Sequence, residues 1–402
     1  MTYENPYINS STWTELNILE TLRKRNPLII CITNDVVRTF TANGLLAIGA
    51  SPVMSECSED LEDLIVHASA LLINIGTVTP DKVTYYKEAI TLAKAHEVPI
   101  VLDPVGCHAG AYRLSVVLDL IKTDAISLLR GNQSEIKAIY DALNTNHKVN
   151  NSLSGKGVDG KQVEDSAIIT YRLARQINCP VVATGEEDYV SDGTRVFAVP
   201  HGHPIMTAVT GTGCLLGAVL AAFFSSYCPF MYNMPIGEFL AYALAYYGLA
   251  GESAVNVRGV KPGSFSVAFM DALYELDDAM LLSENRIRPV VVPDQLKVYF
   301  ISGTQDVGFN ESHLLDIVEA ACRGGATCFQ FREKGIGTLE GQQKLELAQQ
   351  LKEICAMYNV LYIINDDVDL AVAVNADGVH VGQEDMRLED VRNLVGNKVV
   401  GI

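Results

Sequence analysis

Short and almost uninterrupted apolar runs alternate with longer amphipathic segments along the first two-thirds of the chain. Apolar runs of this length are typical of strands buried on both faces, as in a parallel sheet. Segments of helical length, such as 80–95 and 165–176, lie between them. This alternation predicts an α/β layer fold. The predicted strands are 28–33, 70–76, 99–106, 125–132 and 180–186.

The pattern changes after the last of these strands. The segments YVSDG and RVFAVP predict a short hairpin with its turn at Asp192 and Gly193, and helices are predicted from Gly213 to about Leu276. The next stretch holds charges, a Pro-containing VVVPDQ segment and no clear period, as linkers do. We therefore predict a first domain over 1–277 and a linker over 278–296.

A second alternating series follows the linker. Its short apolar runs, separated by amphipathic segments, indicate a regular parallel sheet, for which we expect a (βα)8 TIM barrel. The sequence ends within the fifth run, so the domain over 297–402 is expected to be the N-terminal part of a barrel, truncated. The predicted strands are 297–302, 328–334, 361–366, 378–382 and 399–402.

Composition and charge narrow the classes of function. The 402 residues suggest two or three domains, and 49% hydrophobic against 19% charged residues supports a large core. The formal net charge of -18 disfavours nucleic acids and anionic membranes as partners. Nine cysteines without a Cys-x-x-Cys pair indicate reduced thiols. Because no signal-peptide pattern and no bilayer-length apolar run is present, we expect a soluble cytoplasmic protein.

The strongest chemical signal is TGTGCLLGAVLAAF at 210–223, in which small residues open a long apolar helix. Gly211 and Gly213 let the backbone approach a ligand, and the helix N-terminus directs N–H groups and a positive dipole end toward it. Such an anion hole suits a phosphoryl group in transfer. Cys214 lies in the first turn, where we expect its thiol pKa to fall. Taken alone, the motif fits a glycine-opened core helix with a buried cysteine equally well.

Polar residues also follow predicted strands, where open α/β sheets bind their ligands. In RGNQSE, Arg130 can pair with a phosphate, and Asn132 with Glu135 can hold Mg²⁺ directly or through water. Asp103 ends another strand and can join the same metal site, and Thr184 can touch nucleotide phosphates. The alternative for Asn132 and Glu135 is a helix N-cap followed by a first-turn acid.

In order and spacing, the motifs of the first domain resemble those of hydroxyethylthiazole kinase. The resemblance implies a ribokinase-like α/β domain, ATP as co-substrate with Mg²⁺, and a homotrimer with thiazole sites at subunit interfaces. The matching segments run across nearly the whole domain: CITN (31–34), TANGLLAIGASPVM (41–54), NIGT (74–77), DPVG (103–106), RGNxSE (130–135), TGExDYVSDG (184–193), GHPxMTxVTGTGC (202–214) and PGSF (262–265).

The same resemblance implies roles for individual residues. Cys214 stands where related sugar kinases carry an aspartate base, which makes it the candidate catalytic residue. Because phosphoryl transfer demands positioning and charge neutralisation more than deprotonation, a weak base is tolerable there. The implied ligand contacts are Met54, Asn34 and Gly211 for the thiazole, Arg130, Thr184 and Gly213 for ATP, and Asp103 and Glu135 for Mg²⁺.

Three positions depart from the family pattern. His108 and Gly110 replace small or hydroxyl-bearing residues in the loop after DPVG, and Ala208 replaces a basic residue before VTGTGC. We expect His108, as a lone loop histidine, to face solvent; the alternative is that it alters the approach to the phosphates. Weaker ATP affinity is expected from Ala208 if the missing charge normally contributes.

The last part of the chain resembles thiamin phosphate synthase in QFREK (330–334), IIND (363–366) and GVHVGQEDM (378–386). Each motif ends a predicted strand, where barrel enzymes place their active sites. The alternative for each motif alone is a cap at a strand-to-helix turn. Because the family's later strands are absent, we do not expect this chain to complete the synthase reaction. The implied contacts are Gln330, Arg332, Glu333, Lys334 and Asn365 for a pyrimidine diphosphate, and Asp366 and Asp385 for Mg²⁺.

Together, the resemblances imply a kinase for the hydroxyl of 4-methyl-5-(2-hydroxyethyl)thiazole joined to part of a thiamin phosphate synthase, with small molecules as substrates. Two alternatives stay open: another ribokinase-like kinase, such as one for hydroxymethylpyrimidine, and a non-catalytic thiazole-binding protein. The CITN and SPVM motifs favour the thiazole. ADP release on addition of thiazole distinguishes an enzyme from a binding protein.

Overall fold

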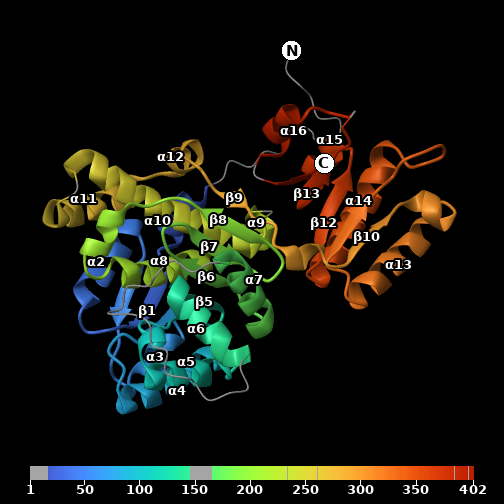
Figure 1. Cartoon of the computed structure of the whole chain (residues 1–402). Coiled ribbons are helices and arrows are strands. Elements are labelled where there is room, and N and C mark those ends of the chain that lie inside the picture. Colours follow the sequence, from blue (N-terminus) through green and yellow to red (C-terminus); the bar gives the residue numbers. More distant parts are fainter. Residues whose placement is uncertain (1–16, 145–164, 233, 260, 384, 397) are drawn as a thin grey trace. The chain divides into compact units, whose positions relative to one another are not determined.

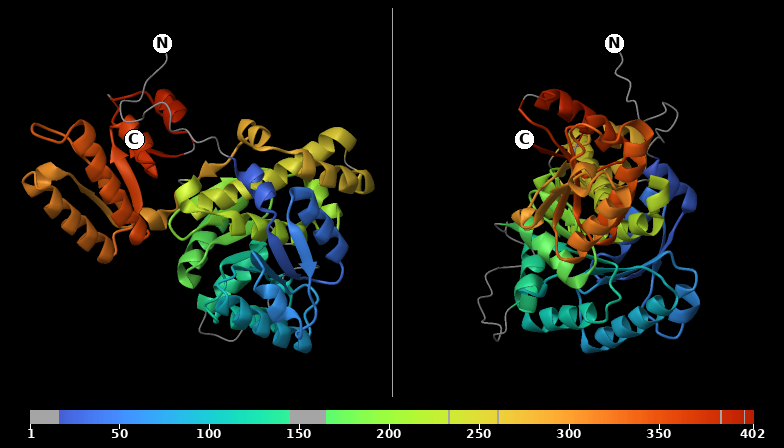
Figure 2. Two further views of the ribbon diagram at one scale, coloured as in Figure 1. Left: turned by 180° about the vertical axis from the view of Figure 1, so that it is seen from behind. Right: turned by 90° about the vertical axis from the view of Figure 1, so that its right-hand side faces the viewer.

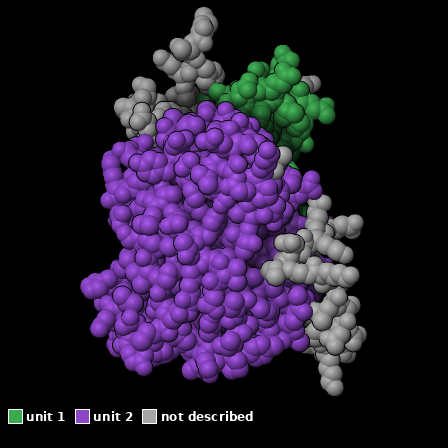
Figure 3. Space-filling model, turned by 90° about the vertical axis from the view of Figure 1, so that its left-hand side faces the viewer, with its two compact units in different colours: residues 1–15, 288–402 green, residues 16–287 purple. Residues whose placement is uncertain are grey.

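The computed structural model describes residues 17–144, 165–232, 234–259, 261–383, 385–396 and 398–402 (Figure 1). Chain contacts divide these residues into two compact units, which Figure 3 colours separately. One unit covers 16–287, and the other includes 288–402. Within the described residues, no helix is both long and apolar enough to cross a membrane.

The first unit is built on a mainly parallel sheet in the order β2-β1-β3-β4-β5-β6-β7-β8. Only β7 and β8 run antiparallel to their neighbours, which confirms the predicted hairpin. Because the remaining strands are parallel, their carboxyl ends share one edge of the sheet. The strands are β1 (Leu28–Ile32), β2 (Ser51–Met54), β3 (Ala70–Asn74), β4 (Ile100–Asp103), β5 (Leu128–Asn132), β6 (Val181–Thr184), β7 (Asp188–Ser191) and β8 (Val196–Val199).

Helices cover both faces of this sheet (Figures 1 and 2). Side-chain alternation along β1 explains why: Ile29 and Cys31 enter one core, and Ile30 and Ile32 enter the other. This double burial produced the continuous apolar runs of the sequence. The first core uses α1 (Ile18–Arg25), α2 (Arg38–Ile48), α8 (Thr212–Ser226), α10 (Ile236–Arg258) and α11 (Pro262–Glu275). The second uses α3 (Leu61–Ile65), α4 (Pro80–Ala95), α5 (Ala111–Ile121), α6 (Gln133–Asn144) and α7 (Ser166–Ile177).

The stretch expected to be a linker contains α12 (Asp278–Ser283) and a short 3₁₀ turn at Pro293–Leu296. Leu281 of α12 is buried in the first unit's core. The Asp278 carboxylate accepts the backbone N–H groups of Leu19 and Glu20 at 2.9 and 3.0 Å, at the start of α1. Part of this stretch therefore packs on the first unit and stabilises its N-terminal helix.

The second unit is a parallel sheet in the order β10-β11-β12-β13-β14, each strand beside the next in sequence. This order confirms the predicted series of consecutive β-α units. The strands are β10 (Tyr299–Ser302), β11 (Cys328–Phe331), β12 (Leu361–Asn365), β13 (Gly378–His380) and β14 (Val399–Gly401). Its core is formed with α13 (Glu311–Arg323), α14 (Gly341–Met357), α15 (Val368–Ala373) and α16 (Leu388–Val395).

Candidate active site

Four polar side chains gather at the carboxyl edge of the first sheet, on the face that α8 covers. They are Asn74, Asp103, Arg130 and Thr184, from β3, β4, β5 and β6, and Asn74 is level with Asp103 in the strand register. Side chains two positions apart on a strand point to the same face of the sheet. The residues two positions before these four belong to the core beneath α8, so the four polar side chains point to that face as well. Those earlier residues are Leu72, Val101, Leu128 and Val182.

Asp103 and Arg130 form a buried ion pair at the centre of this cluster. The Arg130 guanidinium lies 3.4 Å from Asp103 Oδ2 and donates to Thr184 Oγ1 at 3.0 Å. Burial raises the pKa of Asp103 to about 6, although Arg130 and Asn74 counteract the rise. The buried Arg130 Nε–H has no hydrogen-bond partner among the described residues. Arg130 is thus held in place with one donor free for an anionic ligand.

Glu135 provides a second buried carboxylate. Its Oε1 accepts the Gly106 N–H and its Oε2 accepts the Asn132 N–H, both at 2.7 Å, while the Glu135 N–H donates to Asn132 Oδ1 at 2.9 Å. The Asn132–Glu135 pair is therefore a helix cap, and Glu135 also holds the loop after β4. Burial, followed by the charge of Asp103, raises the pKa of Glu135 to about 7.

The acidic pair fits a divalent cation. Among the described residues, Arg130 is the cationic side chain that acts on both buried carboxylates, so a further cation would offset their remaining negative charge. In the described parts of the chain, no cluster of three or more His, Cys, Asp or Glu side chains forms a protein-only metal cage. Mg²⁺ typically takes one or two carboxylates and completes its shell with waters and phosphate oxygens. Asp103 and Glu135 match that donor set.

Cys214 lies in the first turn of α8, which starts after Gly211 in the left-handed conformation (φ +100°). Its Sγ accepts a hydrogen bond from Asn34 Nδ2 at 3.2 Å. Burial, and then the negative charge of Asp103, raise the pKa of the thiol to about 11. The expectation that this thiol has a lowered pKa is therefore wrong, because desolvation outweighs the opposing effects of Asn74, Arg130 and Asn34.

The residues expected to bind the thiazole lie at the neighbouring strand ends. Asn34 follows β1 and is almost fully buried, whereas Met54 ends β2 and is half-buried. A Cβ added at Gly211 would lie 3.0 Å from Phe40 Cδ1, so α2 packs closely against this turn. A Cβ on Gly213 would lie 3.7 Å from the Arg130 guanidinium. The structure brings Asn34 to Cys214 and Gly213 to Arg130.

Two site residues had no role in the sequence prediction. Asn74 donates from Nδ2 to Asp103 Oδ2 at 2.8 Å and is fully buried. Asp188 accepts the Gly185 N–H at 2.9 Å, and burial raises its pKa to about 7. Both stand in recognised motifs, NIGT and TGExDYVSDG, and the available signal was that Asn74 ends β3 and Asp188 begins β7.

His108 differs from its expected position. Its two ring nitrogens are buried and have no hydrogen-bond partner within the described residues, and burial lowers its pKa. The prediction that it faces solvent is therefore wrong. The 3₁₀ turn Cys107–Ala109 that carries it follows the β4 loop directly and packs on α6, which accounts for the burial.

A second set of polar residues ends the strands of the second unit. Lys334 Nζ pairs with Asp366 Oδ2 at 2.7 Å, and Asp385 Oδ2 accepts the Gly382 N–H at 2.9 Å. Gln330 is buried and donates to Tyr299, Arg332 is exposed, and Asn365 precedes Asp366 at the end of β12. Glu333 instead accepts from Thr304 and from the Leu339 N–H, so both of its oxygens hold neighbouring loops.

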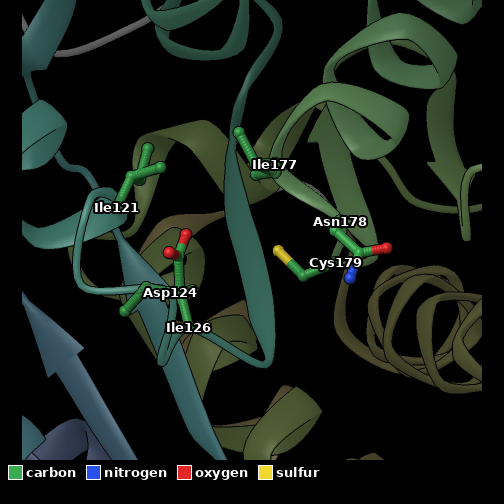
Figure 4. Close-up of a pocket in the computed structure, with 6 residues that line it drawn as sticks. All are labelled: Ile121, Asp124, Ile126, Ile177, Asn178 and Cys179. Carbon is green, nitrogen blue, oxygen red and sulfur yellow. The ribbon is translucent and has the colours of Figure 1, made fainter.

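The structure also contains a small cavity of about 120 Å³ away from these residues (Figure 4). It lies where β5 and β6 begin, whereas the polar cluster lies where these strands end. It is therefore separate from the candidate site. Its lining residues are Ile121, Asp124, Ile126, Ile177, Asn178 and Cys179.

Comparison with known proteins follows the same division of the chain. The Hydroxyethylthiazole kinase family matches residues 19–279, and the Thiamine monophosphate synthase family matches 298–402. A hydroxyethylthiazole kinase of Streptococcus agalactiae is 48% identical over 267 residues, 66% of this chain and 99% of that protein. Hydroxyethylthiazole kinase 1 of Streptococcus pneumoniae is 41% identical over 274 residues, 67% of this chain and 99% of that protein.

Solved structures extend the comparison. The hydroxyethylthiazole kinase of Pyrococcus horikoshii OT3 aligns with a TM-score of 0.60 and 36% identity over 68% of this chain and 98% of its own. A thiamine phosphate pyrophosphorylase of Pyrococcus furiosus is 31% identical over 27% of this chain, with a TM-score of 0.24. The chain spans about half of that protein, 49% of its length.

Proposed function

The chain belongs to the hydroxyethylthiazole kinase family, and we propose that its first unit transfers the terminal phosphoryl group of MgATP to the hydroxyl of 4-methyl-5-(2-hydroxyethyl)thiazole. The observation that carries this proposal is the buried Asp103–Arg130–Thr184 cluster directly beneath the glycine-opened start of α8. The reaction forms a phosphate ester of the alcohol and releases ADP and the hydroxyl proton.

On the nucleotide side, the side chains would bind and orient phosphates. The unpartnered Nε–H of Arg130 supports a phosphate contact, and Thr184 holds the other end of the guanidinium. The backbone N–H groups that follow Gly211, including that of Gly213, lie in the first turn of α8 and would receive the phosphoryl group as its charge shifts.

Asp103 and Glu135 would hold the Mg²⁺ ion that accompanies the nucleotide. When bound, Mg²⁺ neutralises the charge that develops between the phosphates. Arg130 then serves as the fixed cation beside Asp103, and its ion pair keeps that carboxylate in place. The buried carboxylates and the buried arginine support phosphoryl transfer over simple binding, because a protein that only binds thiazole needs neither a metal site nor a phosphate contact.

On the acceptor side, Met54, Asn34 and the Gly211 backbone would contact the thiazole. Cys214 would stand beside the alcohol as the candidate catalytic residue, but a thiol with a pKa of about 11 is a poor acceptor for a proton at neutral pH. Catalysis would then depend on alignment of the alcohol with the phosphoryl group, as a loose transition state permits.

We propose that the second unit binds a pyrimidine diphosphate through Gln330, Arg332, Lys334 and Asn365. Asp366 and Asp385 would hold its Mg²⁺, and the negative charges of both carboxylates beside Lys334 support a shared ion site. Glu333 would act through the loops that it holds.

We further propose that the kinase unit forms a homotrimer with thiazole sites between subunits and works in the cytoplasm. Exposed apolar side chains at Val36 and Leu46, next to the segments that carry Asn34 and Met54, support an interface there. All nine cysteines are free, which supports a reducing compartment. Light scattering on the purified chain measures the oligomeric state.

The decisive test is to incubate the full chain with MgATP and hydroxyethylthiazole and to analyse the products by mass spectrometry. Thiazole phosphate with equimolar ADP is expected. Hydroxymethylpyrimidine in a parallel tube tests the alternative acceptor, and its faster phosphorylation would transfer the assignment to that alcohol. Adding the pyrimidine diphosphate to the first tube tests the second unit, because thiamin phosphate forms only if that unit completes the synthase reaction.

A further inference from the structure

A continuous chain of hydrogen bonds joins the acceptor side of the site to its metal side. Asn34 Nδ2 donates to Cys214 Sγ at 3.2 Å and to Asn74 Oδ1 at 3.1 Å. Asn74 Nδ2 in turn donates to Asp103 Oδ2 at 2.8 Å. Asn74 is fully buried and links the two sides through these bonds.

A backbone donor fixes the direction of every bond in this chain. The Gly76 N–H donates to Asn74 Oδ1 at 2.9 Å, and a backbone N–H cannot accept. Asn74 must therefore present its oxygen to Gly76 and its Nδ2 to Asp103. Because Asn34 faces the oxygen of Asn74, Asn34 must donate to it from Nδ2. The same nitrogen donates to Cys214 Sγ.

Close packing prevents the amides from rearranging. A Cβ added at Gly76 would lie 2.9 Å from both Cβ and Nδ2 of Asn34, so the chain after β3 touches this side chain directly. A Cβ added at Gly217 of α8 would lie 3.3 Å from Asp103 Oδ2. Asn34 and Asp103 are thus confined by backbone on one side and by Asn74 on the other.

We propose that Asn74 is a positioning residue of the kinase: its amide orients Asn34 toward the accepting alcohol and Asp103 toward the metal, and so couples the two half-sites. This inference rests on the proposed function, because it assigns Asn34 and Asp103 to the two substrates. The simpler alternative is that Asn74 only caps the turn after β3 through its bond with Gly76.

Two substitutions separate these roles. Asn74→Asp keeps an oxygen for Gly76 and Asn34 but places a second oxygen against Asp103, whereas Asn74→Ala removes all of these bonds. If Asn74 positions Asn34 and Asp103, Asn74→Asp should lower kcat by about 100-fold and leave the KM for the alcohol within about threefold of wild type. Asn74→Ala is expected to lower kcat by roughly tenfold and to raise that KM, because Asn34 loses its anchor.

If Asn74 only caps the turn, Asn74→Asp should lower kcat less than Asn74→Ala does, because the isosteric aspartate keeps the oxygen that accepts the Gly76 N–H. The matched control is Thr170→Val, which removes a buried hydroxyl bonded to the Ser166 carbonyl at 2.7 Å within α7 and should change neither constant. Steady-state kinetics on the full chain, with thermal unfolding of each variant, provides the comparison. A kcat for Asn74→Asp equal to or above that of Asn74→Ala would overturn the proposal.

A double-mutant cycle covers the case in which Asn74→Asp does not fold. The losses in kcat/KM from Asn34→Ala and Asn74→Ala should be clearly less than additive if the two amides act as one unit. Additive losses would overturn the proposal. A wild-type chain that forms no thiazole phosphate would overturn both this inference and the proposed function, whereas an active wild type with additive variants would overturn the inference alone.

Discussion

The thiol of Cys214 is the residue on which the site chemistry differs most from simple expectation. Its pKa of about 11 makes it a neutral hydrogen-bond acceptor for Asn34 rather than a base. The sequence placed Cys214 at a helix start, but it could not show that the folded chain buries the thiol beside Asn34 and near the charge of Asp103. Helix position is a local property, whereas desolvation depends on the packed structure.

A carboxylate should function at this position. In Cys214→Asp, the Asn34 amide that now donates to sulfur would donate to a charged oxygen, which is a stronger acceptor. We expect kcat to be equal to or higher than that of wild type, because a general base becomes available. Steady-state kinetics against Cys214→Ser, a neutral control of similar size, measures the effect. Complete loss of activity in a folded Cys214→Asp chain would contradict this role.

His201 gives a pH dependence to the stability of the first unit. Its ring is buried, its Nε2 accepts the Arg286 N–H at 3.2 Å, and Nδ1 lies 3.5 Å from Glu252. Burial, followed by the Arg286 charge, lowers its pKa. The unfolded histidine therefore binds a proton at higher pH than the folded one, so stability is lost as pH falls below about 6.5.

The test compares melting temperatures between pH 7.5 and pH 5.5, a range chosen around the free histidine pKa of about 6.5. His201→Gln keeps a hydrogen-bonding side chain without titration, so its melting temperature should fall less on acidification than that of wild type. His67→Gln is the control, because His67 is exposed. If the melting temperatures of wild type and His201→Gln fell equally on acidification, another titrating group would be responsible for the loss of stability at low pH.

At the scale of elements, the buried strands and long helices were predictable and the short edge element was not. The apolar runs located β1, β3, β4, β5 and β6 to within a few residues, because burial on both faces leaves a strong signal. β2 (Ser51–Met54) is four half-buried residues containing a proline, at the end of the sheet order. Such a segment has neither an apolar run nor a clear alternation.

The predicted strands explain why most of the candidate site was found from sequence. Asp103, Arg130 and Thr184 each lie at or near the end of a recognisable parallel strand, and parallel strands end together. Asn74 satisfies the same rule, but its role comes from a side-chain network that crosses from β1 to β4. Pairing between distant side chains has no periodic signature in the sequence, so this part required the structure.

Helix α5 contributes one arginine that holds two site loops together. The Arg113 guanidinium donates to the carbonyls of Ile75 and Gly76, both at 2.9 Å, and to that of Val105 at 3.0 Å. These carbonyls follow β3 and β4, which carry Asn74 and Asp103 at their ends. A planar fork can bond three such acceptors at once, whereas the compact ammonium of lysine cannot match that geometry.

We expect Arg113→Lys to lower the free energy of unfolding by about 1–3 kcal/mol, through the loss of charged hydrogen bonds. It should also lower kcat by roughly tenfold, because small displacements of Asn74 and Asp103 misalign the reaction. Urea unfolding and steady-state kinetics measure the two effects. The control is Arg323→Lys in α13, whose side chain is 67% exposed and pairs with Glu319. An unchanged kcat in a destabilised Arg113→Lys chain would limit Arg113 to a structural role.

At the scale of the whole molecule, each unit has a hydrophobic core of its own. The first unit buries both faces of its sheet, and the second packs its helices on one sheet with residues such as Leu347 and Leu351 at its centre. Separate cores favour separate cooperative unfolding transitions. Each ligand should therefore stabilise one transition, since neither proposed site combines residues of the first unit with residues of the second.

Calorimetry with ligands tests this division. Hydroxyethylthiazole without nucleotide, so that no reaction consumes it, should raise the free energy of unfolding of the first unit alone, by about 2.7 kcal/mol at a ligand concentration of 100 times Kd. The pyrimidine diphosphate with Mg²⁺ should raise that of the second unit alone. Leu347→Ala assigns the transitions, because loss of this buried side chain should cost the second unit about 2–5 kcal/mol. If Leu347→Ala lowered a single transition that both ligands raise, the two units would be one cooperative body, and coupling between the two reactions would become the simpler interpretation.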